Sequence, residues 1–271
     1  MSHPAVPVLH RSTPQHPAYP VTGPSAQGSA FPGLDPHRAA AAPTSDQVVV
    51  VVLADMADRS TLWGWSRLVL QRWPLRHVPG LCFAKVLGSG HGGGFSLRPS
   101  RTRQGLFLVF DGEAAALQFA DSSKEMAGYR LHSTELLVAL LRPFASKGSW
   151  SGTHLQPSAD VPTQGPVAAL TRAAIRPRRV WQFWRMQPAA EKALANASGC
   201  LLAAGVGEAP LLRQATFTVW QDAAAMDAYA RSGAHGQAIR AAYGGDYFSE
   251  SMFVRFAPLR IQGRWQGVQH D

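Results

Sequence analysis

The sequence predicts an α+β fold in which tandem ferredoxin-like repeats form a single-chain dimeric α/β-barrel. Three observations lead to this prediction. An internal repeat covers most of the chain, both copies contain the same order of strands and helices, and that order is βαββαβ. Each ferredoxin-like sheet has one face that its own helices leave uncovered, so pairing two such sheets in one barrel buries both faces.

The composition is that of a globular chain with a basic surface. The 271 residues are 46% hydrophobic and 16% charged, and the formal net charge is +9. This charge favours an acidic partner. The candidate classes are nucleic acid, an anionic membrane surface and an acidic redox protein. No apolar run reaches the roughly 18 residues of a membrane-spanning helix. The two cysteines, Cys82 and Cys200, are too few for a disulfide framework and form no zinc motif, so we expect a reducing, cytoplasmic compartment.

Four segments follow one another along the chain. Residues 1–45 are rich in Pro, Ala, Ser, Gly and His without any period, so we expect a disordered tail that cannot bury enough apolar surface to fold. This stretch lacks the charged start and apolar centre of a secretory signal. A first ferredoxin-like repeat is expected at 46–152, a linker at 153–164 and a second repeat at 165–267.

The repeat depends on two blocks of matching residues. Residues 135–152 match 250–267 at a constant separation of 115 residues, and the shared residues are a Glu, a Pro and a final Gly-x-Trp-x-Gly. Residues 103–119 match 213–229 at a separation of 110, including an Arg-Gln pair. Weaker matches place Trp63, Arg67 and Gly88 opposite Trp181, Arg185 and Gly207.

Both copies show the same predicted elements. Each begins with a Val/Ala-rich strand that precedes an aromatic helix, and continues with two strands, a short Ala-rich helix and a last strand. The expected ranges are 47–54, 62–73, 81–87, 106–110 and 113–120 in the first copy, and 167–174, 180–195, 200–206, 216–220 and 223–230 in the second.

The copies differ in two insertions, and a duplicated scaffold with one active site should differ near that site. The first copy has extra residues at the glycine-rich segment 88–94, and the second has extra residues around His235. Gly88, Gly90 and Gly93 match G-x-G-x-x-G, but a strand is expected to follow instead of a helix. A hairpin loop or pocket lip is therefore favoured over a dinucleotide site.

His235 is the candidate metal ligand. It precedes a segment of helical character, 236–242, from which an imidazole can point into a cavity between helices and sheet. Neutral imidazole is a common axial ligand of haem iron. A surface or helix-capping histidine is the alternative interpretation. His77, His91 and His132 are kept as reserve ligands.

Two groups of side chains have both a structural and a functional interpretation. The aromatic residues of the two helices (Trp63, Trp65, Trp181, Phe183 and Trp184) are core residues or the lining of a flat apolar cavity for a large cofactor or polyene. The arginines at 172, 176, 178, 179 and 185 are a solvated surface, or they pair with haem propionates, lipid phosphates or an acidic electron donor.

Other function classes lack their motifs. No nucleic-acid motif accompanies the arginines, and exposed aromatic residues are not interleaved with them, so we expect no nucleic-acid partner. G-x-S-x-G and H-E-x-x-H are both absent, which speaks against serine and zinc hydrolases.

Several short motifs occur in an order that resembles the spheroidene monooxygenase family. They are Gly80-Leu-Cys-Phe-Ala-Lys-Val-Leu-Gly-Ser-Gly90, Leu170-Thr-Arg-Ala-Ala-Ile-Arg176, Gly207-Glu208 with Leu212-Arg-Gln214, Ala234-His-Gly-Gln-Ala-Ile-Arg240 and Phe248-Ser-Glu250. The resemblance covers residues 46–267 and leaves out the tail. It implies a haem-dependent enzyme that uses O2 and reduced ferredoxin to oxidise C-2 of an acyclic carotenoid, such as spheroidene, to a ketone.

The resemblance also implies roles for single residues. His235 is carried over by position as the haem ligand, with Arg240, Trp181 and Arg185 as further cofactor-binding candidates. The implied chemistry is O2 binding to ferrous haem, hydrogen abstraction and hydroxylation at C-2, and then a second hydroxylation to a geminal diol that collapses to the ketone. Since a carotenoid is long and apolar, we expect peripheral attachment to the inner membrane. Anionic lipid attracts each nearby basic residue with about 1 kcal/mol.

Two alternatives stay open at this point. The first is a non-catalytic α/β-barrel that holds haem or a lipophile. The second is a relative of the antibiotic-biosynthesis monooxygenases that needs no cofactor. Haem that co-purifies with the protein would count against the second alternative.

Overall fold

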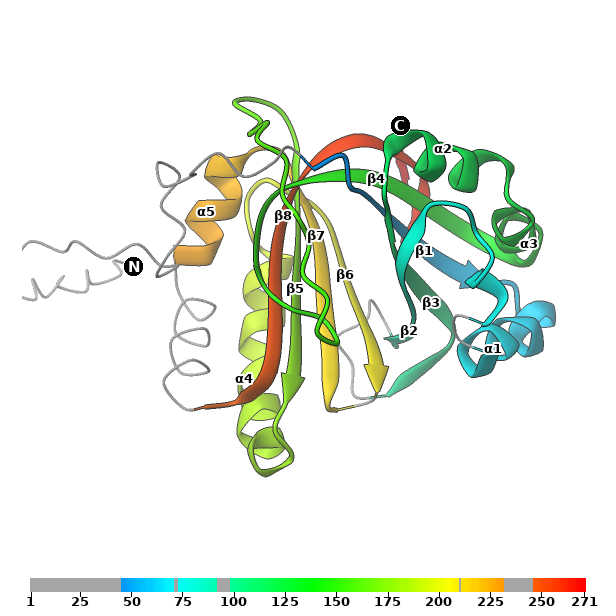
Figure 1. Cartoon of the computed structure of the whole chain (residues 1–271). Coiled ribbons are helices and arrows are strands. Elements are labelled where there is room, and N and C mark those ends of the chain that lie inside the picture. Colours follow the sequence, from blue (N-terminus) through cyan, green and yellow to red (C-terminus); the bar gives the residue numbers. More distant parts are fainter. Residues whose placement is uncertain (1–44, 71–72, 92–97, 210, 232–245) are drawn as a thin grey trace, which may run out of the picture. The chain divides into compact units, whose positions relative to one another are not determined.

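Eight strands of the chain form one antiparallel sheet that closes into a barrel (Figure 1). The computed structural model describes residues 45–70, 73–91, 98–209, 211–231 and 246–271. The predicted tail, apart from residue 45, lies outside the described residues, and so do His235 and Arg240.

The elements follow the predicted order in both halves. The first half consists of β1 (Val48–Met56), α1 (Thr61–Leu70), β2 (Leu81–Gly90), β3 (Pro99–Phe110), α2 (Glu113–Ser122), α3 (Lys124–His132) and β4 (Ser133–Gly148), with short 3-10 helices η1 (Asp58–Ser60) and η2 (Trp73–Leu75). The second half consists of β5 (Val167–Ile175), η3 (Pro177–Arg179), α4 (Val180–Ala195), β6 (Cys200–Ala209), β7 (Arg213–Trp220), α5 (Ala223–Arg231) and β8 (Phe248–Trp265), and β9 (Val268–His270) pairs with β8.

The sheet order is the same in each half. It runs β4-β1-β3-β2 in the first half and β8-β5-β7-β6 in the second. Two seams join the halves: a long one between β4 and β8, and a short one at Gly88↔Gly207 and Ser89↔Val206 between β2 and β6. The long seam is reciprocal, since Leu141 pairs with Pro258 and Pro143 pairs with Phe256.

The repeated Glu and Gly-x-Trp-x-Gly residues hold the two halves together. The Glu135 carboxylate accepts hydrogen bonds from the N–H groups of Gln266 and Gly267, both 2.8 Å long. The Glu250 carboxylate accepts one from the N–H of Gly152 at 2.9 Å. Each glutamate therefore binds the turn that ends the other half. Gly152 and Gly267 have φ values of 74° and 80°, a backbone conformation that glycine adopts without steric cost.

The barrel interior is filled with apolar side chains from both halves. The largest include Phe107, Trp150, Phe217 and Phe256, each at most 1% exposed. The interior of the described barrel is therefore an apolar core. The helices cover the outside of the barrel, with α1–α3 over the first half and α4 and α5 over the second (Figure 1).

Two connections bear on the sequence predictions. β2 and β3 pair as an antiparallel hairpin, with Gly90 opposite Pro99, so a strand follows the glycine-rich segment where a dinucleotide fingerprint needs a helix. Gly93 lies outside the described residues. The connection predicted as a linker contains no helix or strand. It packs on the barrel because Leu155 is buried and the Ser158 N–H donates to the Pro143 carbonyl at 2.7 Å.

Candidate functional site

At several outer-face positions the sheet carries larger side chains in the first half than in the second. One row of neighbours across the four first-half strands consists of Val86, Leu106, Val52 and Val138. The equivalent row across the second-half strands consists of Gly205, Thr216, Thr171 and Phe253. The next row consists of Ala84, Leu108, Val50 and Leu140 in the first half and Ala203, Thr218, Ala169 and Arg255 in the second. The second-half side chains are thus smaller at positions of β5, β6 and β7, whereas on β8 Phe253 and Arg255 are larger than their counterparts.

This exchange leaves space beneath the second-half helices. Val50 and Val52 are fully buried under α1–α3. At the equivalent positions Ala169 is half-buried and Thr171 is exposed, although β5 is a central strand of its half. The described side chains of α4 and α5 therefore do not fill the layer above the sheet. We refer to the outer-face positions Ala169, Thr171, Gly205 and Thr216, of which Gly205 is buried and Thr171 exposed, as the second-half hollow.

A small apolar cluster closes one end of the second-half hollow. It consists of Val167, Leu194, Trp220 and Met226, with Tyr229 packed against it. The rings of Trp220 and Tyr229 lie 5.1 Å apart, and burial raises the pKa of the Tyr229 hydroxyl. The Trp220 indole N–H donates to the hydroxyl of Thr218 at 2.9 Å. This end is thus apolar, and the buried indole N–H in it has a hydrogen-bond partner.

Aromatic side chains border the opposite end. The Phe183 ring on α4 meets Trp184 and Phe248 edge-to-face, at centroid distances of 5.7 and 6.0 Å. The Trp184 indole N–H donates to the Leu211 carbonyl at 3.0 Å, which holds this end of α4 against the β6–β7 connection. Apolar rings around small residues can accept a flat, largely apolar ligand.

The helices above the hollow have few rigid attachments. Leu194 is the one buried residue of α4. Pro188 lies inside α4 and has no N–H for the carbonyl of Trp184, so the hydrogen-bond ladder is interrupted there. On the other side, Asp227 of α5 pairs with Arg255 of β8 at 2.7 Å.

The structure places the predicted site residues in two locations. Trp181 and Arg185 lie one turn apart on the exposed side of α4, and Trp181 is 82% exposed. His235 and Arg240 belong to the chain between α5 and β8, outside the described residues. Phe183 and Trp184, for which the sequence favoured a core position over the lining of a cavity, are the aromatic residues of α4 at the hollow.

The reserve histidines lie in the first half. The His132 ring stacks on Trp63 with a centroid distance of 4.4 Å, and its Nδ1 is 3.0 Å from the Ser60 hydroxyl. His77 and His91 are exposed. Across the described part of the chain, no three His, Cys, Asp or Glu side chains gather into a group that could hold a metal ion.

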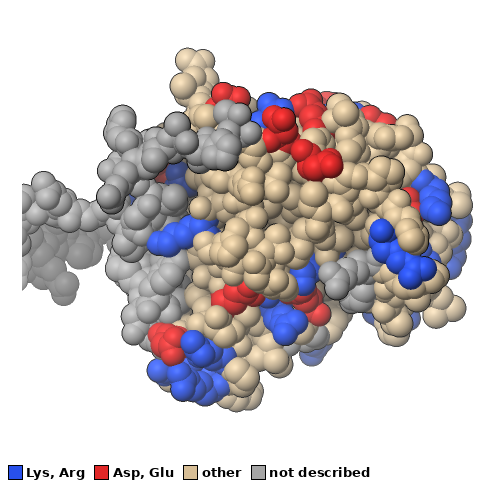
Figure 2. Space-filling model, viewed as in Figure 1, with Lys and Arg blue, Asp and Glu red and all other residues tan. Residues whose placement is uncertain are grey.

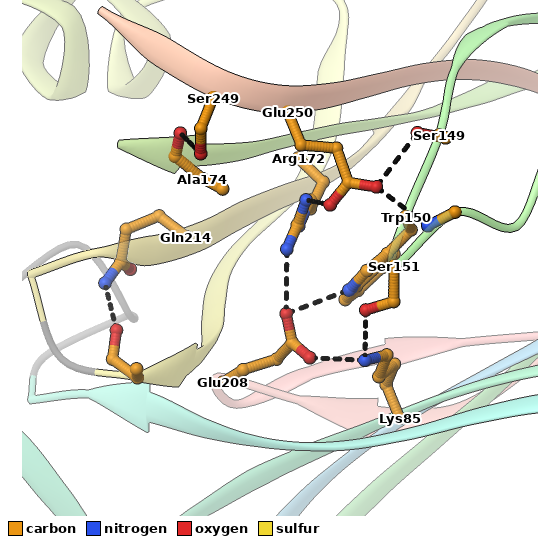
Figure 3. Close-up of polar contacts among 12 residues, drawn as sticks. Lys85, Ser149, Trp150, Ser151, Arg172, Ala174, Glu208, Gln214, Ser249 and Glu250 are labelled. Carbon is orange, nitrogen blue, oxygen red and sulfur yellow. Dashed lines mark hydrogen bonds and ion pairs between the residues drawn. The ribbon is translucent and has the colours of Figure 1, made fainter. Parts of the chain in front are cut away.

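Arg172 has a different environment from the other arginines of its stretch. It is 2% exposed and points into one end of the barrel (Figure 3). Its guanidinium pairs with Glu250 at 2.5 Å and with Glu208 at 3.1 Å. The solvated-surface interpretation is therefore wrong for Arg172, because a charge can be buried at this depth only when it is paired. Arg176 and Arg178 are at the surface, where both pair with Asp246.

Glu208 connects this network to the first half. Its carboxylate also accepts a 2.6 Å bond from the Lys85 ammonium and a 2.9 Å bond from the Trp150 indole (Figure 3). Burial alone would raise the pKa of Glu208, but hydrogen bonds from Lys85, Trp150 and Arg172 hold that pKa below its ordinary value. The network thus ties β2, β5, β6 and β8 together beside the short seam.

The comparisons with known proteins agree on one family. No family model matches the chain. Over 248 residues the chain is 49% identical to the spheroidene monooxygenase of Rubrivivax gelatinosus, which covers 92% of this chain and 94% of the relative. It is 36% identical to the spheroidene monooxygenase of Rhodobacter capsulatus, over 76% of this chain and 87% of the relative. The chain belongs to the spheroidene monooxygenase family.

The fold of this spheroidene monooxygenase family member also occurs in a distant enzyme. An aldoxime dehydratase, solved in complex with butyraldoxime, superposes with a TM-score of 0.53 at 8% identity, over 78% of this chain and 79% of that one. At this identity the likeness extends to the fold alone. Among the described helices of this chain, none has the length and apolar character needed to cross a membrane.

Proposed function

We propose that this chain is a carotenoid monooxygenase that binds haem in the second-half hollow and introduces a keto group at C-2 of an acyclic carotenoid. The observation that carries the proposal is the replacement of larger side chains by smaller ones at outer-face positions of β5, β6 and β7. Gly205 and Thr216 stand where the first half has Val86 and Leu106. Family membership supports the substrate class, since the relatives are named spheroidene monooxygenases.

The described residues fit a haem in three respects. The hollow is lined by small side chains, one end is closed by the Trp220 cluster, and the other is bordered by Phe183, Trp184 and Phe248. His235 would supply the iron ligand and Arg240 a partner for a propionate, since both belong to the chain that follows α5 directly. Arg185 and Trp181, on the exposed side of α4, would contact the cofactor only at its solvent-facing edge.

A bound haem would supply the activation of O2, with electrons from reduced ferredoxin. The chain itself would position the carotenoid end and keep water out. Thr171 and Thr216 are direct partners across β5 and β7, so their hydroxyls offer polar contacts next to Gly205. Two hydroxylations of one carbon, each consuming one O2, two electrons and two protons, give a geminal diol, and loss of water from the diol leaves the ketone.

The barrel itself is proposed to be a fusion of two ferredoxin-like repeats. Three features support a duplication: the identical strand orders, the reciprocal register of β4 and β8, and the exchanged contacts of Glu135 and Glu250 with the terminal turns. After duplication one half could keep a packed outer layer while the other opened the hollow.

The first experiment is an absorption spectrum of the full chain, produced with a haem precursor. We expect a stoichiometric Soret band that shifts when carbon monoxide is added to the reduced protein. His235→Ala should lose this band, whereas His77→Ala, at an exposed position of the first half, should keep it. A normal haem spectrum in His235→Ala would refute the ligand, and no Soret band in the unmodified protein would refute haem dependence.

A turnover assay then separates enzyme from binding protein. The haem-loaded chain is incubated with spheroidene, O2 and a ferredoxin-reducing system, and the ketone is measured. Production of the C-2 ketone is the expected result. Haem binding without turnover would instead identify a barrel that only holds haem or a lipophile.

A further inference from the structure

Helix α1 is apolar on both of its long faces. On the inner face Trp63 and Leu68 pack against the first-half core, and Gly64 is buried. A helix at the surface of a soluble protein normally pairs one such apolar face with a polar one. The outer face of α1 is therefore expected to be polar, and it is not.

The outer face carries a row of exposed apolar side chains that continues into η2. Leu62 and Val69 are 82% and 79% exposed, and Trp65 and Trp73 are 51% and 58% exposed. The spacing of Leu62, Trp65 and Val69 by three and four residues places these three in one line along α1, and Trp73 is the first residue of η2. We refer to Leu62, Trp65, Val69 and Trp73 as the α1 stripe.

The other long helices do not share this feature. The exposed side of α4 carries Arg185, Glu191 and Lys192 besides Trp181, and that of α2 carries Glu113, Gln118 and Asp121. The α1 stripe is thus a property of one helix, and contiguous exposed apolar surface of this kind marks an interaction site.

Polar groups contact both tryptophans of the stripe, one at the indole N–H and the other over the ring face. The Trp65 indole N–H donates to the Arg101 carbonyl at 3.1 Å. The Arg76 guanidinium lies 4.5 Å from the centroid of the Trp73 ring. Tryptophan with one apolar and one polar side is the residue that favours the boundary between lipid and water.

Positive charge surrounds the stripe. Residues 59–80 contain four arginines, at 59, 67, 72 and 76, and no Asp or Glu. A hollow of about 460 Å³ next to Trp73 is lined by Arg67, Arg76, His77 and Lys124, with Glu125 as its one acidic side chain. Lys and Arg side chains gather over α1 and α3 in Figure 2. An apolar stripe bordered by cations complements an anionic lipid surface.

We propose that the α1 stripe docks this protein onto an anionic lipid bilayer, with α1 lying in the plane of the headgroups. The stripe enters the boundary between headgroups and acyl chains, and the arginines contact lipid phosphates. The inference deepens the proposed function, which requires access to a carotenoid dissolved in lipid. It adds the surface through which the protein reaches that lipid.

The test is co-sedimentation of the full chain with extruded vesicles, either of phosphatidylcholine alone or of phosphatidylcholine with phosphatidylglycerol. We expect binding to the anionic vesicles that weakens with salt. Leu62→Gln/Val69→Gln should bind about tenfold more weakly or worse, because two nearly fully exposed anchors are lost without any change in the core. The matched control is Val161→Gln/Val268→Gln, which changes two exposed valines outside α1 and should bind like the unmodified protein.

The outcomes separate this inference from the proposed function. Equal binding of Leu62→Gln/Val69→Gln and the unmodified protein would overturn the α1 stripe as the docking surface while membrane attachment stands. No binding of the unmodified protein to anionic vesicles would overturn both the docking and the peripheral attachment. A dimer in solution that the double substitution dissociates would assign the stripe to a second copy of the chain instead of lipid. Neither haem nor carotenoid is present in this assay, so its result does not depend on catalysis.

Discussion

Glu250 joins the two halves at the level of single residues. Its carboxylate receives hydrogen bonds from Ser149 and Gly152 of the first half and an ion pair from Arg172 of the second. Burial alone would raise the pKa of this group. The backbone N–H groups of Gly152 and Ser151, the Ser149 hydroxyl and Arg172 outweigh burial and lower the pKa from 4.5 to about 2.

A pH dependence of stability follows from this lowered pKa. Because the pKa is lower in the folded than in the unfolded chain, the stabilisation by Glu250 is complete above about pH 4.5 and is lost as the pH falls from there towards 2. Glu250→Gln should therefore unfold more easily at pH 7, by about 1–3 kcal/mol, and depend less steeply on pH in that window. Urea unfolding at a series of pH values measures this. The control is Glu191→Gln on the exposed side of α4; an equal pH slope for Glu250→Gln and the unmodified protein would contradict the assignment.

At the scale of elements, the same strand pattern supports two different helix–sheet layers. Alternating residues of β1 and β5 face the helices in both halves, yet Val50 and Val52 are covered while Ala169 and Thr171 are not. The alternation of strand residues decides which side chains face outward, and their size decides whether the layer is closed.

Filling the second-half hollow should remove its ligand without harming the fold. Thr171→Val/Thr216→Leu restores the residues at the equivalent first-half positions, Val52 and Leu106. We expect haem retention to fall at least tenfold while the free energy of unfolding, measured on the haem-free protein, stays equal or rises, because apolar atoms replace two hydroxyls. Thr163→Val, at an exposed position of the connection between the halves, is the control and should leave both quantities unchanged. Full haem retention in the double variant would place the cofactor elsewhere.

Prediction from sequence worked well for elements with a strong periodic pattern. The helix expected at 180–195 coincides with α4, and every expected strand is present. Helix α3 was not predicted because Met126 and Tyr129 are its only buried residues and the rest of its sequence is polar. It begins after Ser123, whose hydroxyl accepts from the N–H of Met126, and this cap is visible in the sequence only once the boundary is known.

On the scale of the whole molecule, the two seams differ in extent. β4 and β8 pair from Leu137↔Gly263 to Gly148↔Met252, with two register shifts on the way. The described residues of β2 and β6 pair at Gly88↔Gly207 and Ser89↔Val206, supported by the Ser89 hydroxyl, which donates to the Gly205 carbonyl at 2.8 Å.

Local opening of the barrel should therefore begin at the short seam. In hydrogen–deuterium exchange of the native protein, peptides covering Gly88 and Ser89 should exchange faster than peptides covering 138–147. Lys85→Gln removes the ion pair with Glu208 beside this seam and should speed exchange there without affecting the long seam. Equal protection at both seams would show that the barrel opens as one unit.

The sequence by itself determined the order of elements and the family, and it predicts a duplication. These properties are recorded in local patterns: alternating strands, periodic helices and a repeated Glu with Gly-x-Trp-x-Gly. It did not reveal that each glutamate binds the other half's turn, or that Arg172 is buried between Glu208 and Glu250. Nor did it locate the second-half hollow or the exposure of the α1 stripe. Those depend on which side chains meet across strands far apart in the chain, because charge burial and layer packing are set by neighbours in space, and only the tertiary structure decides those neighbours.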